Sequence, residues 1–296
     1  SPIMSVRAIA FISFSLGLLY ATAYATGLEA YANLALSIQI FVFLVHGLPN
    51  MSEKFYDASG SLTHLALILS SLLQHTIRHP RQIVCSVLGI IWLTRLGSFL
   101  FQRILRDGRD TRFDRLKKNG LTFFVPWAIQ ALWVFFIDLP IIIINHHQEP
   151  TAHGEAGFGR ISYLDMVGWS LWVFGFFFEL IADSQKFAFR NKASNHEKFI
   201  TSGLWAHSQH PNYFGEICMW SAITVSCVSS FTEAQHFLGF ISPLFTYVLL
   251  MHVSGVPMLR KKADKKWKGN PAYELYIAQT PVLIPKVSPT IIPKDE

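Results

Sequence analysis

Charged residues are scarce in this chain. Only 15% of its 296 residues are Asp, Glu, Lys or Arg, and 51% are hydrophobic. Soluble domains carry about 25% charged residues, so the composition is that of a membrane protein. The three cysteines, Cys85, Cys218 and Cys227, all lie inside apolar runs and lack ligand spacing. Neither a disulfide framework nor a zinc site is therefore predicted.

The common motifs of soluble cofactor sites are also missing. No Gly-x-Gly-x-x-Gly follows a strand, no Gly-Lys-Ser/Thr loop is present, and there is no His-Glu-x-x-His pattern. A Rossmann site and a metal site are therefore not predicted. The net charge is +6, but the basic residues lie in loops between apolar runs. We interpret them as determinants of membrane topology and predict no nucleic-acid partner.

Long apolar runs are abundant instead. A spanning helix needs about 20 apolar residues, and the sequence predicts an all-α, multi-pass transmembrane bundle of seven to eight spans. We expect residues 1–120 to form the substrate side and residues 121–296 a domain with a cofactor pocket. The first and third candidate spans are the weakest. The candidates are Arg7–Ala25, Glu29–Leu48, Ser61–Thr76, Gln82–Ile104, Leu121–Asn145, Ile161–Ala182, Tyr213–Ser230 and His236–Val256.

The distribution of basic residues predicts an orientation. Lys and Arg concentrate at 103–118, at 186–198 and after Met258, and the positive-inside rule puts these segments in the cytosol or matrix. Arg78 and Arg81 would then lie outside, a mild exception. For Lys117, Lys118, Lys265 and Lys266 a purely orienting role is favoured. The endoplasmic reticulum, the mitochondrial inner membrane and the bacterial inner membrane fit this pattern equally.

The stretch from Gly203 to Trp220 is the most informative in the chain. Pro211 restrains His210 to an extended conformation and allows a helix to begin beside it. On that helix Asn212 and Glu216 share a face, and Gly215 permits close approach to the backbone. A polar helix start at a membrane edge suits an anionic or nucleotide ligand. An aromatic helix entry at the membrane interface is an equally good reading of the spacing.

This stretch resembles a known family. The run His-Pro-Asn-Tyr-Phe-Gly-Glu from His210 to Glu216, preceded by Gly203-Leu-Trp, is similar to the signature of the steroid 5-alpha-reductase C-terminal family. The nearest branch is a broad set of membrane proteins catalogued as a domain of unknown function. The resemblance extends from about Ser52 to Pro285. Further matching segments are Glu179–Lys186, Ser254–Leu259, Gly269–Tyr276 and Thr280–Pro285.

Several residues are candidates for binding NADPH, the cofactor that the resemblance implies. Glu179 and Asp183 lie four apart at the end of an apolar run, and carboxylates there usually face the protein interior or a wet cavity. Lys186 and Arg190 follow and suit phosphate groups. An ion pair at the interface would explain Asp183 without a ligand. The resemblance adds Asn212, Tyr213 and Glu216. His210 could contact phosphate or be an ordinary interface histidine. Tyr273 and Tyr276 could stack on an adenine, although packing is favoured for both.

The catalytic candidates are Tyr56, Asp57 and Arg95. In steroid reductases a carboxylic acid and a tyrosine polarise the substrate ketone, but their Gln-Glu pair is not evident here. Arg95 stands where the family pattern has a tyrosine. An arginine within a span needs a carboxylate or ligand partner, and Asp57 is one candidate. Asp57 could equally cap the helix that follows.

We therefore expect a membrane reductase that uses NADPH to reduce an activated carbon–carbon double bond in a steroid-like or other lipid. One alternative is a methyltransferase that uses S-adenosylmethionine, because isoprenylcysteine carboxyl methyltransferases share the His-Pro-x-Tyr-x-Gly core. Another is a non-catalytic membrane subunit of a larger complex. The expected partners are a lipid substrate, membrane lipids and, for the last alternative, other membrane subunits.

Overall fold

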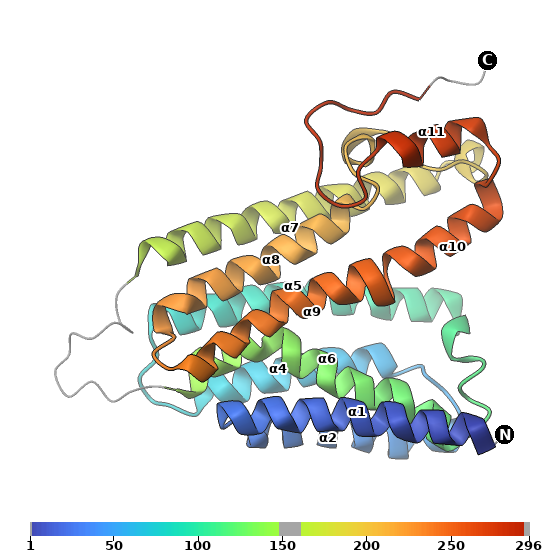
Figure 1. Ribbon diagram of the computed structural model, residues 1–296. Helices are drawn as coiled ribbons and strands as arrows, with labels where there is room; N and C mark the ends of the chain where they lie inside the picture. The colour runs from blue at the N-terminus through green and yellow to red at the C-terminus, as the bar shows by residue number, and fades with distance from the viewer. Residues whose placement is uncertain (1, 148–160, 293–296) are drawn as a thin grey trace. The chain divides into compact units, whose positions relative to one another are not determined.

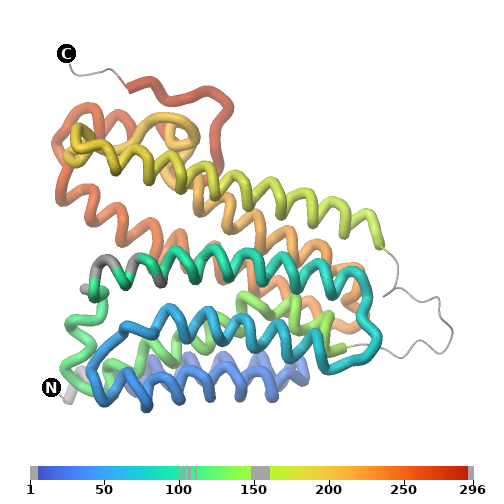
Figure 2. The backbone as a smooth tube through the Cα atoms, turned by 180° about the vertical axis from the view of Figure 1, so that it is seen from behind, coloured from blue at the N-terminus to red at the C-terminus, as the bar shows by residue number. Residues whose placement is uncertain are grey.

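Helices make up all the regular structure in residues 2–147 and 161–292, which the computed structural model describes. Figures 1 and 2 show these helices from opposite sides. The predicted all-α class is confirmed. The chain forms two compact units, the first from Ser1–Met166 with Ile223–Ser242 and the second from Val167–Ala222 with Pro243–Glu296. The predicted functional division at residue 120 stays a prediction.

The helix boundaries follow local signals. α5 begins with a reciprocal capping box between His79 and Gln82, with Pro80 at its first position, and ends before Gly108 in the left-handed conformation. α11 is capped by the side chain of Asn270. The helices are α1 (Pro2–Thr26), α2 (Glu29–Val42), α3 (Leu48–Asn50), α4 (Tyr56–Leu73), α5 (Pro80–Asp107), α6 (Gly120–His146), α7 (Tyr163–Arg190), α8 (Pro211–Cys227), α9 (Ile241–Val248), α10 (Val256–Trp267) and α11 (Pro271–Gln279).

Six helical segments within the described ranges are long and apolar enough to cross a membrane. Each overlaps a predicted span. The predicted spans Ser61–Thr76 and Tyr213–Ser230 correspond to α4 and α8, which are helices but do not belong to these six. The six segments are Val6–Thr26, Glu29–Asn50, Pro80–Leu100, Gly120–His146, Tyr163–Arg190 and Ala234–Trp267.

α6 forms the centre of the first unit. Its span has a mean hydropathy of 2.1, the highest of the six, and a helix that is apolar on all sides is suited to full burial. α1, α2, α4 and α5 all pack against it, as the green helix in Figure 1 shows. Trp127, Phe123 and Phe135 are completely buried along its length.

Buried acid–base pairs occur at two places in the described part of the first unit. Arg81 at the start of α5 contacts Asp165 at the start of α7 through two hydrogen bonds of 2.6 Å. His64 on α4 lies 2.9 Å from Asp138 on α6, between Nδ1 and Oδ2. Neither pair was predicted from the sequence. Buried ion pairs inside a membrane unit are costly unless they are well bonded, so both require an explanation.

A close glycine crossing holds α7 and α8 together in the second unit, where both views show them side by side. A Cβ atom on Gly215 would lie 2.6 Å from the carbonyl oxygen of Gly175 and 2.8 Å from the backbone nitrogen of Glu179. The sequence predicted that something approaches the backbone at Gly215. The structure identifies the approaching group as α7, in the manner of small-residue contacts between membrane helices.

Gly215→Ala is therefore expected to lower the free energy of unfolding by about 1–3 kcal/mol, because the added methyl group meets backbone that cannot move aside. Gly17→Ala in α1 is the matched control, since its Cβ would meet nothing within 4 Å. That control should stay within about 1 kcal/mol of the parent. Thermal unfolding in one detergent compares the two variants, and equal stability would refute the tight crossing.

Candidate functional site

The loop before α8 is fixed to the C-terminal tail. Gln209 donates from its backbone N–H to the Pro281 carbonyl at 2.9 Å and from its side chain to the Ile277 and Thr280 carbonyls. Ser208 Oγ donates to the Leu283 carbonyl at 2.7 Å. His207 Nδ1 lies 2.8 Å from the carbonyl oxygen of Lys286, close enough to donate to it. These three polar side chains therefore hold the tail against the start of α8.

His210 lies at the junction of this loop and α8. Its backbone N–H donates to Ser208 Oγ at 3.1 Å, and its ring stacks on Tyr213 with centroids 5.2 Å apart. Nδ1 is buried and has no hydrogen-bond partner within the described chain. A buried polar atom without a partner is costly. The ring is thus fixed in place with one polar atom left over for another group.

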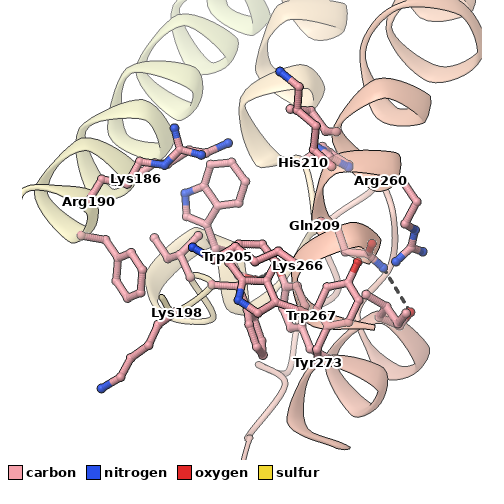
Figure 3. Close-up of a pocket in the computed structure, with 18 residues that line it drawn as sticks. Lys186, Arg190, Lys198, Trp205, Gln209, His210, Arg260, Lys266, Trp267 and Tyr273 are labelled. Carbon is pink, nitrogen blue, oxygen red and sulfur yellow. Dashed lines mark hydrogen bonds between the residues drawn. The ribbon is translucent and has the colours of Figure 1, made fainter. Parts of the chain in front are cut away.

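A cavity of about 290 Å³ opens beside His210 in the second unit. Figure 3 shows its lining, which comes from α7, from the loop before α8, and from α10 and α11. Six cationic and six aromatic side chains surround it, and none of the described residues that line it is a carboxylate. The cations are Lys186, Arg190, Lys198, Arg260, Lys262 and Lys266; the aromatic residues are Phe189, Phe199, Trp205, Trp267, Tyr273 and Tyr276.

The aromatic side chains are held by a network of their own. Phe199 packs within 5.4–5.8 Å of the ring centroids of Trp267, Tyr273 and Tyr276. Tyr276 donates its hydroxyl to the Trp205 carbonyl at 2.8 Å. The ammonium of Lys186 lies 4.3 Å from the centre of the Trp205 ring, as in a cation–π contact. The cavity is thus lined both by flat aromatic side chains, which this network holds in place, and by positively charged side chains.

The charges around the cavity act on His210. Burial, followed by the positive charges of Lys186 and Arg260, lowers the pKa of His210 from 6.5 to about 4. The imidazole is therefore neutral at pH 7 and offers one donor and one acceptor. An anion in the cavity would offset both cations and raise this pKa.

The shifted pKa predicts a pH dependence of stability. Between pH 4 and 6.5 the unfolded chain binds the His210 proton and the folded chain does not, so this residue makes stability rise with pH across that window. The full effect is about 3 kcal/mol at most. His210→Asn should therefore flatten the rise in thermal unfolding temperature between pH 4 and 6.5. Parallel curves for parent and variant would show that His210 does not carry the dependence.

Five of the ten predicted cofactor-binding residues line the cavity: Lys186, Arg190, His210, Tyr273 and Tyr276. The other five, Glu179, Asp183, Asn212, Tyr213 and Glu216, do not belong to its lining. Among these, Glu179 is buried where α7 meets Gly215. Asn212 resembles His210, because its Oδ1 is buried without a hydrogen-bond partner in the described part of the chain.

The three predicted catalytic residues lie in the first unit. Tyr56 donates its hydroxyl to the Pro126 carbonyl at 3.1 Å and packs against Phe113 and Trp127, which is a structural environment. Asp57 and Arg95 are half-buried on α4 and α5. These two helices cross closely at Ser61 and Gly97, where a Cβ on the glycine would lie 2.6 Å from the serine hydroxyl. The catalytic role of all three stays a prediction.

Several cavity residues were missed in the sequence. Arg260, Ala263 and Trp267 on α10 recur at spacings of three and four and all line the cavity. That helical periodicity was a usable signal for a cavity-facing side. It was overlooked because the basic residues after Met258 were interpreted as orienting charges. In residues 2–147 and 161–292 no group of three or more His, Cys, Asp and Glu side chains is arranged to hold a metal ion.

Fold and cavity together define a helical membrane protein with a cation-rich, aromatic-walled cavity in its second unit. The chain belongs to the family DUF1295, described as a protein of unknown function, which matches residues 42–280. The match covers most of the chain, including the loop that carries His210. No curated protein and no solved structure matches it.

Proposed function

We propose that the cavity binds NADPH and that the protein reduces a carbon–carbon double bond conjugated to a carbonyl group in a lipid. The observation that supports this proposal is the lining: six cations, six aromatic rings and no carboxylate. NADPH is a polyanion with two flat ring systems, so its charge and shape complement such walls. Its affinity would come from charge-assisted bonds to phosphate and from stacking.

Individual residues suit different parts of this ligand. Arg190 and Arg260 can hold phosphate oxygens through two parallel bonds each. Trp267 and Tyr273 offer faces for a base. Nδ1 of His210, buried and unpartnered, would take a hydrogen bond from or give one to a ligand group. A volume of about 290 Å³ is at the small end of ligand cavities, which run from about 300 to 1,000 Å³, so it would enclose one nucleotide half.

The reaction follows from the resemblance to steroid 5-alpha-reductases. Bound NADPH would supply a hydride to the β carbon of the double bond. The protein would bind the lipid in the membrane, stabilise the negative charge that develops on the carbonyl oxygen and hold the proton that completes the α carbon. Steroid-like lipids are the substrates that the resemblance implies.

Charge argues against the methyltransferase alternative. S-adenosylmethionine carries a positive sulfonium and a positive amino group against one carboxylate. Six cations line the cavity, one of them paired with Glu197 at 3.1 Å, and together they would repel this ligand, because like charges brought together without solvent are costly. A non-catalytic subunit that keeps the nucleotide is compatible with the same lining and has to be tested by activity.

The test uses the purified protein in lipid nanodiscs. NADPH is expected to raise the unfolding temperature, less so at high salt because cation–phosphate attraction is screened, and S-adenosylmethionine is expected to have no effect. Stabilisation by S-adenosylmethionine alone would overturn the proposal. Oxidation of NADPH in the presence of enone lipids then tests catalysis. Nucleotide binding with no oxidation, in a protein recovered only within a larger complex, would favour the non-catalytic alternative.

A further inference from the structure

The His64–Asp138 pair differs from an ordinary structural ion pair. His64 is 2% exposed and Asp138 is fully buried, with Nδ1 and Oδ2 2.9 Å apart. Nε2 of His64 and Oδ1 of Asp138 are both buried without a hydrogen-bond partner in the described chain. Asp165, by contrast, accepts hydrogen bonds on both oxygens from Arg81 and from neighbouring serines. The His64–Asp138 pair therefore has unused hydrogen-bonding capacity.

The number of protons that the pair shares determines whether Nε2 of His64 is a hydrogen-bond donor or an acceptor. Inside an apolar unit a net charge is costly, so the pair is stable when it is neutral overall. Two arrangements satisfy that condition. In one, an imidazolium faces a carboxylate, and both ring nitrogens carry hydrogen. In the other, the carboxylic acid donates to Nδ1, so the hydrogen of the neutral ring is on Nε2. In both arrangements Nε2–H is a donor that points away from Asp138.

Two tryptophan rings pack against the imidazole ring that carries this donor. The ring of Trp92 is 5.4 Å from that of His64 at 77°, and the ring of Trp133 is 5.1 Å away at 90°. Trp92 is buried, whereas Trp133 on α6 is partly exposed. The His64 ring thus packs against two aromatic side chains, one of which is partly exposed at the protein surface. A lipid-soluble molecule with a single acceptor oxygen has the complementary chemistry.

We infer that His64, oriented by Asp138, is a binding site for the carbonyl oxygen of a lipid-soluble ketone. The Nε2–H donates to the carbonyl oxygen, and Asp138 holds the ring and balances its charge. A donor of this kind also stabilises negative charge that builds up on the bound oxygen. Calling the ketone the substrate rests on the proposed function, whereas the binding site itself does not. His64 would then supply the carbonyl-polarising group that Tyr56, Asp57 and Arg95 were predicted to supply.

Infrared difference spectroscopy on the nanodisc protein tests this inference without nucleotide. The probe is an enone steroid with an isotope-labelled carbonyl. In the parent the labelled C=O band should move to lower frequency than in empty nanodiscs. His64→Phe should abolish the shift and weaken binding by at least about tenfold, the effect of losing one strong hydrogen bond. Asp138→Asn should leave a smaller shift, because it removes the carboxyl group that orients the ring and keeps a hydrogen on Nε2.

Ser71→Ala is the matched control. It lies two turns from His64 on α4 and removes a buried hydrogen bond of 3.0 Å to Asn145 on α6, so it probes stability without touching the donor. Its band should match the parent. An unshifted band in a folded parent, or an unchanged band in folded His64→Phe, would overturn the inference. NADPH titration of the same samples is independent, so failure of nucleotide binding with a His64-dependent shift would refute only the reductase proposal.

Discussion

Asp165→Asn is expected to lower the free energy of unfolding by about 3–5 kcal/mol, the usual effect of removing one partner of a buried ion pair. Asp165 is completely buried and Arg81 is 2% exposed. The carboxylate accepts two hydrogen bonds of 2.6 Å from Arg81 and one of 2.7 Å from Ser226. The variant removes the carboxylate charge that faces the buried guanidinium. It also weakens every bond that the carboxylate accepts.

Thermal unfolding in a single detergent measures this loss, with Arg112→Ala as the control. Arg112 also pairs with an aspartate, Asp110, but its side chain is 46% exposed, and exposed pairs contribute about 0–1 kcal/mol. Replacing Arg81 and Asp165 together by Met and Leu should cost less than the sum of the single changes, since no uncompensated charge remains. If Asp165→Asn is no worse than Arg112→Ala, the pair does not hold α5 to the start of α7.

The same pair shows what topology rules could not predict. Arg81 was a mild exception to the positive-inside rule, because the rule counts charges and takes no account of their partners. Its partner lies 84 residues away in the sequence, and one sequence contains no signal for that pairing. The positions of the helices were easier to predict from the sequence, because a long apolar run alone predicts a spanning helix. The span of α6, for example, was located to within a few residues.

Only some of the ionisable residues inside these apolar runs were predicted as site residues. Glu179 and Asp183 were predicted as site residues because they are carboxylates at the end of an apolar run, whereas Asp138 was not predicted. Yet Asp138 lies inside the most hydrophobic of the six described spans, where an ionisable residue suggests function by default. The rule could have selected it together with His64, which the sequence also places in an apolar run. What no pattern could supply is that these two side chains meet.

For the cavity, the contributing segments were easier to predict than the individual lining residues. Residues 186–198 and the segment after Met258 were expected on one side of the membrane, and both contribute residues to the cavity lining. Which residues of α10 line the cavity depends on the face that this helix presents to it. Arg260 and Lys266 line the cavity while Lys265, one residue from Lys266, is exposed and does not. Neighbouring lysines of equal charge are separated only by helix geometry, and their different positions provide the sharpest test of the site.

Replacing Arg190 and Arg260 by Gln is accordingly expected to weaken NADPH binding by about tenfold or more each. A hydrogen bond to a charged group contributes about 1.5–3 kcal/mol, which corresponds to roughly 10- to 100-fold in affinity. The two arginines come from different helices, α7 and α10, so if each holds a different phosphate the double variant should lose the product of the two factors. Unfolding temperatures without nucleotide should change little, since neither arginine is fully buried.

Lys265→Ala is the control, because it removes one positive charge from the same helix outside the cavity. Specific contacts predict near-parent affinity for this variant and a large loss for Arg260→Gln. A general attraction between a basic surface and an anion predicts equal losses, which added salt would erase together. Equal losses in affinity would therefore mean that the positive charge of the region attracts NADPH without specific contacts in the cavity. Unequal losses would require that α10 presents Arg260, and not Lys265, to the bound phosphate.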